Sequence, residues 1–249
     1  MIISYKHKYI FIHCRKTAGS SIKCFLNKYI GPKDIQIGSW HEVIHNQGSF
    51  NRRFIVDLLA FRLFFNISTW KNIKKGLCNK NIYKQLNSIH KKYYNLYHPS
   101  ASDLAKFDES AWNNFFKFCF VRNPYEKAVS DYIWRVKAKN LDISFLDFLK
   151  HLESPNLYKD DHIVPTQIDN WPMYTINDKI AVDFIGKYEN LYHDFEQICK
   201  IIGLPFYKSQ FPRVKHYADY KYREYYGATE KRLVSKIYEK EIECFGYSF

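Results

Sequence analysis

The sequence predicts an α/β fold of three layers, with a central parallel sheet covered by helices on both faces. Two short apolar runs, residues 9–12 and 118–121, have no polar face, as expected of strands that are buried on both sides. Each run ends in a small, polar, cationic turn, and each turn leads into a segment with the apolar spacing of an amphipathic helix. The pattern therefore indicates strand–turn–helix units with polar groups gathered at the turns.

Length and composition favour one domain over residues 1–249. The chain is 46% apolar, which is enough to bury a full core. Residues 31–95 contain a Gly-Pro turn and two helical segments near 53–66 and 79–93, and we expect them to form a helical insertion or lid. Lys and Arg outnumber Asp and Glu by 38 to 25. This excess predicts attraction to an anion, whether a nucleotide, a nucleic acid, an acidic glycan or a membrane surface.

The six cysteines are scattered and form no Cys-x-x-Cys pair, so we expect reduced core residues of a cytoplasmic protein. The first strand is expected within about ten residues of Met1, which leaves no room for a signal peptide. The most apolar stretch, residues 54–65, is interrupted by Asp57 and Arg62 and is too short to span a bilayer. An amphipathic helix in contact with a membrane surface is the alternative for that stretch.

The turn at residues 13–21 has the features of a phosphate-binding loop. Small residues at 18–19 let a ligand approach the backbone, and the unpaired N–H groups of the following helix favour an anion. In the ordinary loop of nucleoside-triphosphate enzymes the lysine directly follows the last glycine. Here Lys16 comes three residues before Gly19, which argues against that loop and for a relative of it.

The second turn follows the run 118–121 and begins at Arg122. Asn123 and Pro124 are typical of the N-cap and the first position of a helix. A guanidinium at a strand end is suited to a phosphate dianion, and the hydroxyl of Ser130 could complete the binding site. The plainer alternative is an arginine that forms a salt bridge at a helix end.

Three histidines are candidates for chemistry. His98 follows an aromatic run at 93–97, expected to be a strand, and precedes a capping box that begins at Ser100. That position is at the edge where α/β sheets bind ligands, although a surface histidine ahead of a helix cap would give the same pattern. His41 and His45 would share a helix face, but with no third ligand nearby we expect no metal site.

Both turns resemble elements of the sulfotransferases that use 3′-phosphoadenosine 5′-phosphosulfate (PAPS). Residues 15–21 resemble the 5′-phosphosulfate loop, and residues 122–130 resemble the 3′-phosphate-binding element. With further matches at 183–191 and in the tail from 222 to 247, the chain is similar to the carbohydrate sulfotransferase superfamily, particularly its short bacterial members and the glycan 2-O-sulfotransferases. The segment at 31–95 has no such match. The resemblance implies a P-loop-like core.

The resemblance also implies an activity: transfer of the sulfuryl group from PAPS to a hydroxyl, most often of a carbohydrate, with release of 3′-phosphoadenosine 5′-phosphate. Lys16 would neutralise the leaving phosphate, and Arg122 and Ser130 would hold the 3′-phosphate. His98, 24 residues before Arg122, matches the place of the general base in 2-O-sulfotransferases, although those relatives often carry a His-x-His pair there. The implied donor-binding residues are Arg15, Lys16, Thr17, Ala18, Gly19, Ser20, Ser21, Arg122 and Ser130.

Several alternatives stay open. A small-molecule kinase of the nucleotide-loop class would need a lysine directly after the glycine, and a non-catalytic polyanion-binding protein would spread its cations over an outer face. The general base is His98, His41, His45 or a carboxylate. Lys215 and Arg223 have two possible roles. They contact the donor or an acidic acceptor, or they are solvated surface charges. The acceptor is expected to be a glycan or another hydroxyl compound rather than nucleic acid, and its identity and the oligomeric state are not encoded in these motifs.

Overall fold

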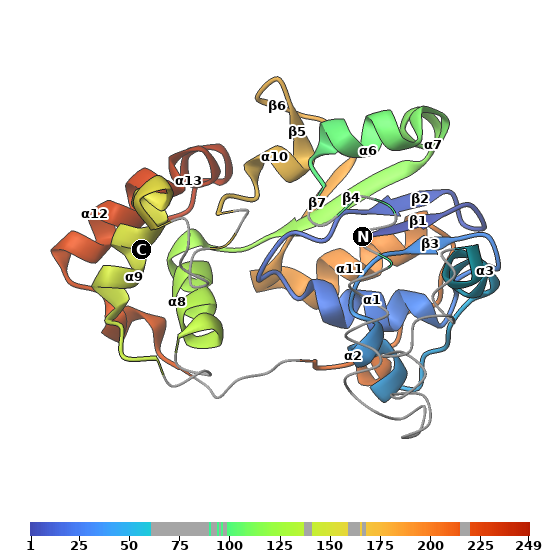
Figure 1. The fold of residues 1–249 in the computed structure, drawn as a ribbon, viewed down its shortest axis with the longest axis horizontal. Coiled ribbons are helices and arrows are strands. Elements are labelled where there is room, and N and C mark those ends of the chain that lie inside the picture. The colour runs from blue at the N-terminus through green and yellow to red at the C-terminus, as the bar shows by residue number, and fades with distance from the viewer. Residues whose placement is uncertain are drawn as a thin grey trace.

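The protein is described here from a computed structural model that covers residues 1–60, 90, 94, 96, 99–136, 141–158, 165, 168–214 and 220–249, with residues 58–60 as backbone only. A five-stranded sheet lies at the centre of the described part (Figure 1). Its strands, in order across the sheet, are β3 (Ile35–Gln36), β1 (Ile2–Ser4), β2 (Tyr9–Phe11), β4 (Phe116–Val121) and β7 (Phe184–Lys187).

The sheet is parallel where the two turns leave it. β2 pairs with β4 in parallel, with Phe11 opposite Phe118, and β4 pairs with β7 in parallel, with Phe118 opposite Phe184. These pairs confirm the predicted parallel core. β1 runs antiparallel to both β2 and β3, which the sequence pattern did not indicate. A tight turn ending at Lys8, whose φ is 54°, joins β1 to β2, as only antiparallel neighbours allow.

Alternate strand residues face opposite helical layers, which gives the three layers expected (Figure 1). Ile10 and Cys119 face the core beneath α6, α7 and α10, whereas Phe11 and Phe118 face the core beneath α1 and α11. The helices of these layers are α6 (Ala101–Phe107), α7 (Glu109–Asn114), α10 (Trp171–Tyr174), α1 (Gly19–Asn27) and α11 (Leu191–Ile201). The ends of β2 and β4 therefore open between two packed layers.

A group of helices lies beside the sheet, on the left of Figure 1. It has its own core, in which Val129, Phe148 and Val234 are fully buried. Its members are α8 (Pro124–Arg135), α9 (Phe145–Glu153), α12 (Ala228–Ile237) and α13 (Glu239–Phe245). The remaining described elements are α2 (Trp40–His45), α3 (Arg52–Ala60), the hairpin β5 (Thr175–Ile176) and β6 (Lys179–Ile180), and 3-10 turns at Pro155–Tyr158, Tyr188–Asn190, Lys208–Gln210 and Tyr222–Tyr225.

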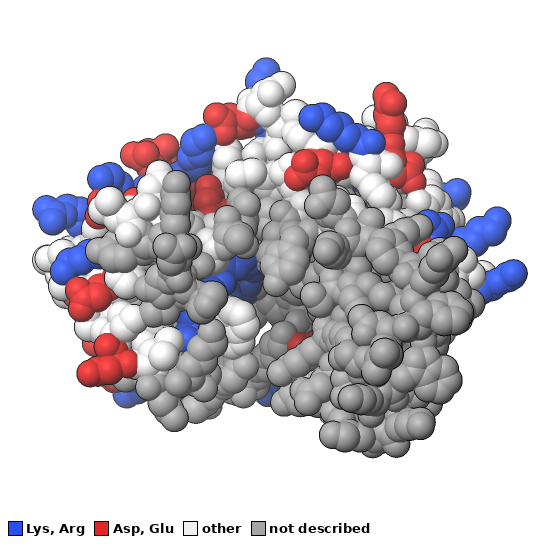
Figure 2. Space-filling view, viewed as in Figure 1, with Lys and Arg blue, Asp and Glu red and all other residues white. Residues whose placement is uncertain are grey.

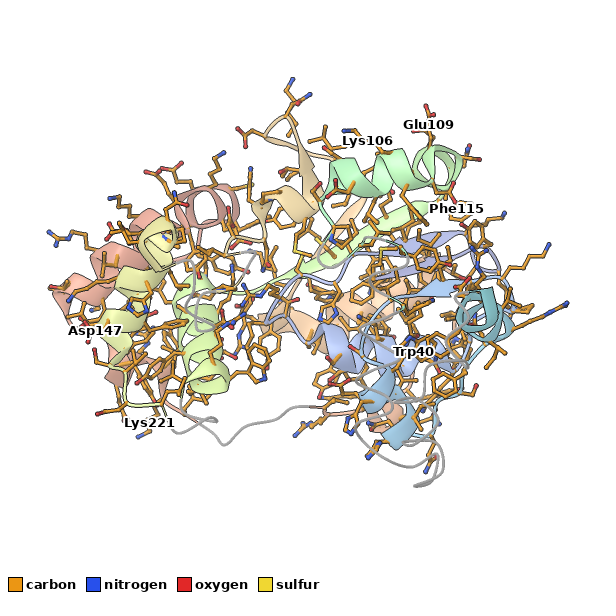
Figure 3. The ribbon with its side chains drawn as sticks, viewed as in Figure 1. Trp40, Lys106, Glu109, Phe115, Asp147 and Lys221 are labelled. Carbon is orange, nitrogen blue, oxygen red and sulfur yellow. The ribbon has the colours of Figure 1, made fainter. Side chains whose placement is uncertain are left out.

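The first half of the expected insertion at 31–95 lies against the sheet and α1. It contributes the edge strand β3, and then α2 and α3, whose packing centres on Trp40 (Figure 3). Trp40 is fully buried, with its ring 4.4 Å from that of Phe54 between centroids. The predicted helix at 53–66 corresponds to α3 as far as Ala60; the rest of it, and most of the helix expected at 79–93, lie outside the described residues.

The strand expected at 93–97 is wrong for the residues that can be checked. Tyr94 is helical, and Leu96 belongs to no regular element. The Tyr94 hydroxyl donates a hydrogen bond of 2.6 Å to the Asp57 carboxylate, which ties Tyr94 to α3. The aromatic run gave a strand-like pattern because a short apolar run does not distinguish a strand from a helix.

The described cysteines are free thiols, as predicted. Four of them are buried, as expected of core residues, whereas Cys244 is exposed, so the expectation of a core position is wrong for it. The buried ones are Cys14, Cys24, Cys119 and Cys199. Cys78 lies outside the described residues. Among the helices that can be described, none has the length and apolar character needed to cross a membrane.

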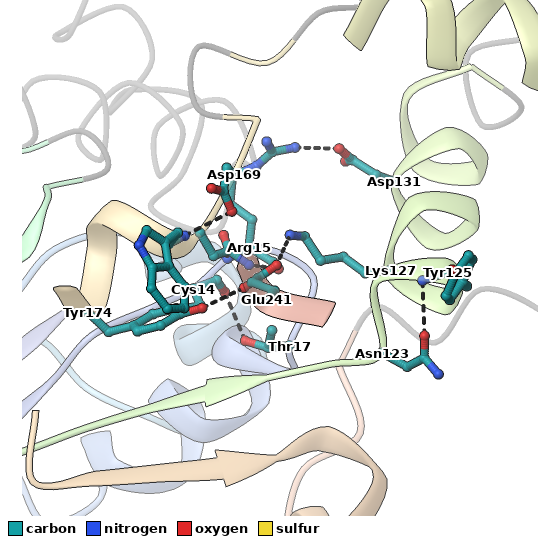
Figure 4. A network of polar contacts seen from close by, with 12 residues as sticks. Cys14, Arg15, Thr17, Asn123, Tyr125, Lys127, Asp131, Asp169, Tyr174 and Glu241 are labelled. Carbon is teal, nitrogen blue, oxygen red and sulfur yellow. Dashed lines mark hydrogen bonds and ion pairs between the residues drawn. The ribbon is translucent and has the colours of Figure 1, made fainter. Parts of the chain in front are cut away.

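A buried ion pair joins α8 to α13. The Lys127 ammonium lies 2.9 Å from the Glu241 carboxylate, and both side chains are almost fully buried. Tyr174 donates a further hydrogen bond of 2.8 Å to the same carboxylate (Figure 4). The Tyr238 ring lies 4.1 Å from the ammonium. Each charge is therefore satisfied by its partner and by an additional polar or aromatic group.

Replacing one member of this pair should be costly. Glu241→Leu would leave the Lys127 ammonium buried without its counter-ion, and we expect the free energy of unfolding in a denaturant titration to fall by about 3–5 kcal/mol. The double variant Lys127→Met/Glu241→Leu should recover most of that loss, because neither charge remains. Lys150→Ala, which breaks the exposed pair with Asp147 on α9 (Figure 3), is the control and should change stability far less. If Glu241→Leu and Lys150→Ala lowered the free energy of unfolding equally, the importance assigned to the buried pair would be contradicted.

Candidate active site

The segment 12–18 makes a tight turn between β2 and α1. The Thr17 hydroxyl donates to the Cys14 carbonyl at 3.0 Å, and Lys16 and Ala18 adopt φ values of 63° and 62°. Such positive φ values are unfavourable for residues with a side chain. The turn must therefore be held in place by contacts with the rest of the protein.

Asn170 supplies such a contact. The Arg15 N–H donates to Asn170 Oδ1 at 2.9 Å, and Asn170 Nδ2 donates to the Arg15 carbonyl at 3.1 Å. Asn170 is completely buried, so its amide satisfies both backbone groups of Arg15 as a neighbouring strand would. Sequence reasoning missed this residue. Its place before Trp171 resembles a helix N-cap, yet its side chain caps nothing in α10 because it is bonded to Arg15.

No side chain of α1 caps its first turn. Ala18 stands at the N-cap position and offers no side-chain cap, and the first turn holds no acidic residue. Ser20 and Ser21 are buried there, with the Ser20 hydroxyl 3.3 Å from that of Ser39. The N–H groups at the start of the helix therefore keep their positive field.

His13 covers this turn, although the sequence analysis gave it no role. A Cβ atom at Gly19 would lie 1.9 Å from His13 Cδ2, so the ring packs directly on the glycine backbone. The ring is also nearly parallel to that of Phe11, at 15°. The sequence did contain a signal for a role of His13, because this histidine follows a strand and lies inside a phosphate-binding motif.

Arg15 and Asp131 connect the turn to α8 (Figure 4). Arg15 Nη2 lies 2.6 Å from Asp131 Oδ2, and Arg135 Nε lies 3.2 Å from Asp131 Oδ1. Burial alone would raise the pKa of Asp131, but the charges of Arg15, Arg135 and Lys16 lower it below its ordinary value. Asp131 is therefore a buried carboxylate that stays ionised, and the Arg15 guanidinium is fixed by it.

Arg122, at the end of β4, joins the second turn to the first. Its Nη1 donates to the Lys16 carbonyl at 3.2 Å, and its Nη2 donates to Glu126 at 2.6 Å and to the Tyr220 hydroxyl at 3.3 Å. The guanidinium also stacks on the Tyr188 ring, 4.0 Å from its centroid. Burial acts to lower the pKa of Arg122, but Glu126 and the tyrosines raise it, so the side chain stays charged.

Ser130 lies on the face of α8 that is turned toward both loops. Asn123 caps this helix and Pro124 opens it, as predicted. Glu126, Ser130 and Trp134 are spaced four apart and so share one face. Glu126 contacts Arg122, and the Trp134 ring centroid is 5.4 Å from the Lys16 ammonium. Half-buried Ser130 lies between them.

Not every residue singled out from the sequence can be placed. His98 and Lys215 lie outside the described residues. Arg223 stacks on an aromatic ring of the C-terminal segment. The rings of His41 and His45 lie 4.2 Å apart between centroids, and no group of three or more potential metal ligands occurs in the part of the chain that is described.

The ion pair between the turn and α8 gives a pH-dependent prediction. Asp131→Asn would leave the Arg15 guanidinium buried beside a neutral amide, and we expect the free energy of unfolding at pH 7 to fall by about 3–5 kcal/mol. Because the folded-state pKa is lowered, this stabilisation is complete above the ordinary value of 3.8 and is lost as the pH falls through the folded-state pKa. Denaturant titrations should therefore show that the difference in free energy of unfolding between the unaltered protein and Asp131→Asn disappears only at acidic pH. A difference that becomes smaller near neutral pH would contradict this prediction.

Comparison with known proteins agrees with the arrangement of the turns. A model of the sulfotransferase family matches residues 1–248. An uncharacterised protein of Archaeoglobus fulgidus is 38% identical over 117 residues, which cover 45% of this chain and 87% of that protein. No solved structure matches. Since the family match spans both turns and nearly the whole chain, the protein belongs to the sulfotransferase family.

Proposed function

We propose that the protein transfers the sulfuryl group of PAPS to a hydroxyl of a carbohydrate and releases 3′-phosphoadenosine 5′-phosphate. The observation that carries this proposal is the hydrogen bond from the Arg122 guanidinium to the Lys16 carbonyl. It supports the proposal because one nucleotide can contact both turns only if they lie close together. Separate cavities for Lys16 and Arg122 would have argued against the proposal.

The first turn would bind the 5′-phosphosulfate end. Backbone N–H groups at the start of α1 and the hydroxyls of Ser20 and Ser21 are hydrogen-bond donors suited to a phosphate. The Thr17 hydroxyl donates to the Cys14 carbonyl, so Thr17 would contribute its backbone N–H. Arg15 would add positive charge from its place beside Asp131. The residues assigned to this end are Arg15, Lys16, Thr17, Ala18, Gly19, Ser20 and Ser21.

Arg122 and Ser130 would bind the 3′-phosphate, the group that distinguishes PAPS from ATP. Arg122 Nε is buried and has no hydrogen-bond partner among the described residues. A buried charged donor of this kind normally has an acceptor. A phosphate oxygen is the partner that a guanidinium is best suited to bind.

The chemistry requires in-line placement of the acceptor more than covalent help from the protein. The acceptor oxygen attacks sulfur, and the bond from sulfur to the 5′-phosphate oxygen breaks. Lys16 would neutralise the charge that develops on that leaving oxygen, and His98 would take the proton of the acceptor hydroxyl. None of these steps calls for a metal ion.

Two other functions are less well supported. A nucleotide-loop kinase would need a lysine where this chain has Ser20. A polyanion-binding protein would gather its cations on an outer face, whereas Figure 2 shows Lys and Arg interspersed with Asp and Glu over the visible, described part of one face. The charges of the candidate site instead lie at strand ends.

The expected setting is the cytoplasm, where thiols such as the buried Cys14 and Cys119 stay reduced. The acceptor would be a glycan met there, free or at a membrane surface. Nucleic acid is not expected as a substrate.

Nucleotide binding tests the proposal directly. In titration calorimetry, 3′-phosphoadenosine 5′-phosphate should bind with a Kd of roughly 1 μM or tighter, and adenosine 5′-phosphate, without the 3′-phosphate, should bind at least about tenfold more weakly. Lys16→Ala and Arg122→Ala should each weaken the bisphosphate strongly. Lys150→Ala, on the outer face of α9, is the control. Indifference to the 3′-phosphate would favour the kinase.

The turnover number of a His98 variant tests whether His98 is the general base. His98→Ala should lower kcat by roughly 10²–10⁴-fold, the usual contribution of a general base, with nucleotide affinity nearly unchanged. His193→Ala, at an exposed histidine of α11, is the matched control. If the rate of His98→Ala is unchanged, the proton acceptor is another group, and His13, His41 and His45 become the next variants to measure.

A further inference from the structure

Trp134 is a large aromatic side chain that α8 does not bury. Its side chain is 37% exposed, while the opposite face of the helix packs into a core around Val129. The Lys16 ammonium lies 5.4 Å from its ring centroid and the Arg135 guanidinium 5.0 Å from a ring of the same side chain. An exposed indole is therefore held beside the lysine assigned to the leaving phosphate.

The acceptor has to react close to the lysine beside this indole. To act on the leaving oxygen, the Lys16 ammonium must come within a hydrogen bond of it, about 3 Å. The sulfur is one bond further on, and the attacking hydroxyl approaches the sulfur in line from the other side, about 3 Å away. These lengths are comparable to the 5.4 Å between the ammonium and the ring of Trp134. The acceptor therefore reacts near Lys16, and the indole is an exposed aromatic surface beside that lysine.

The surroundings of the ring favour one class of acceptor. A phenol or a lipid alcohol is normally bound in an enclosed apolar pocket. Here the indole is flanked by Lys16, by Arg135 and, behind them, by the ionised Asp131. A pyranose suits such a site, because its face of C–H groups can stack on the indole while its rim of hydroxyls meets the charged groups.

We infer that Trp134 forms one wall of the acceptor site and selects pyranosides by stacking on the sugar ring. This inference rests on the proposed function and deepens it. Trp134 thus determines specificity for the acceptor, while the phosphate-binding turns determine specificity for the donor.

The first test compares acceptors on the unaltered protein. With radiolabelled PAPS, the panel contains the methyl pyranosides of glucose, galactose, mannose, N-acetylglucosamine and glucuronic acid, the matching open-chain alditols, and phenol. At least one pyranoside should have a kcat/KM about tenfold or more above its alditol and above phenol. Equal or better use of the alditols or phenol, or sulfation of none of the pyranosides, would overturn the inference.

The second test uses variants with the best pyranoside. Trp134→Ala should raise its KM about tenfold with kcat within about threefold, and Trp134→Phe should restore most of the affinity because a ring remains. Tyr207→Ala, at an aromatic residue that is 58% exposed and follows α11, is the matched control and should leave KM unchanged. An unchanged KM in Trp134→Ala would overturn the inference.

Calorimetry with 3′-phosphoadenosine 5′-phosphate distinguishes a failure of the acceptor assignment from a failure of the proposed function. If the unaltered protein and Trp134→Ala both bind it equally well but pyranosides are not preferred, only the acceptor assignment fails. If the unaltered protein does not bind it, the proposed function fails as well.

Discussion

The hydrogen bond from Arg122 to the Lys16 carbonyl is the constraint on which the candidate site depends. The two residues are 106 positions apart in the chain, and they meet because β2 and β4 are parallel neighbours whose carboxyl ends lie at one edge of the sheet. The same guanidinium is bonded to Glu126, so its position is fixed from both sides. A phosphate bound at Arg122 is thereby linked through one side chain to the backbone that would hold the second phosphate.

Helix α8 forms the other side of this site, and two buried ion pairs set its position. Asp131 holds the Arg15 side chain of the first turn, and Lys127 holds Glu241 of α13. A buried pair of this kind is costly to break but contributes little net stability over an apolar contact of the same shape. Its effect here is on geometry: it fixes the rotation of α8, so that Ser130 and Trp134 face the turns.

The parts of the fold that follow from local pattern were predictable. The strands at 9–12 and 118–121 and the helix opened by Asn123 and Pro124 depend on burial and capping within a few residues, and the structure confirms them. Asn170 was not predictable, because its partner Arg15 is 155 residues away. The strands β1 and β3 were missed for a related reason: each is three residues or fewer, too short to show a period.

The balance of charge around the turns has a consequence for the choice of ligand. In the described part of the site, the cations are Arg15, Lys16, Arg122 and Arg135, and the carboxylates near them are Glu126 and Asp131. Arg15 and Arg122 already have carboxylate partners, so an incoming phosphate must share or displace those bonds, and its affinity is a difference between two sets of contacts. A single phosphate would leave part of the excess positive charge uncompensated. A nucleotide with phosphates at its 3′ and 5′ positions would compensate it at both turns, and for this reason the second phosphate should contribute more than its own contacts.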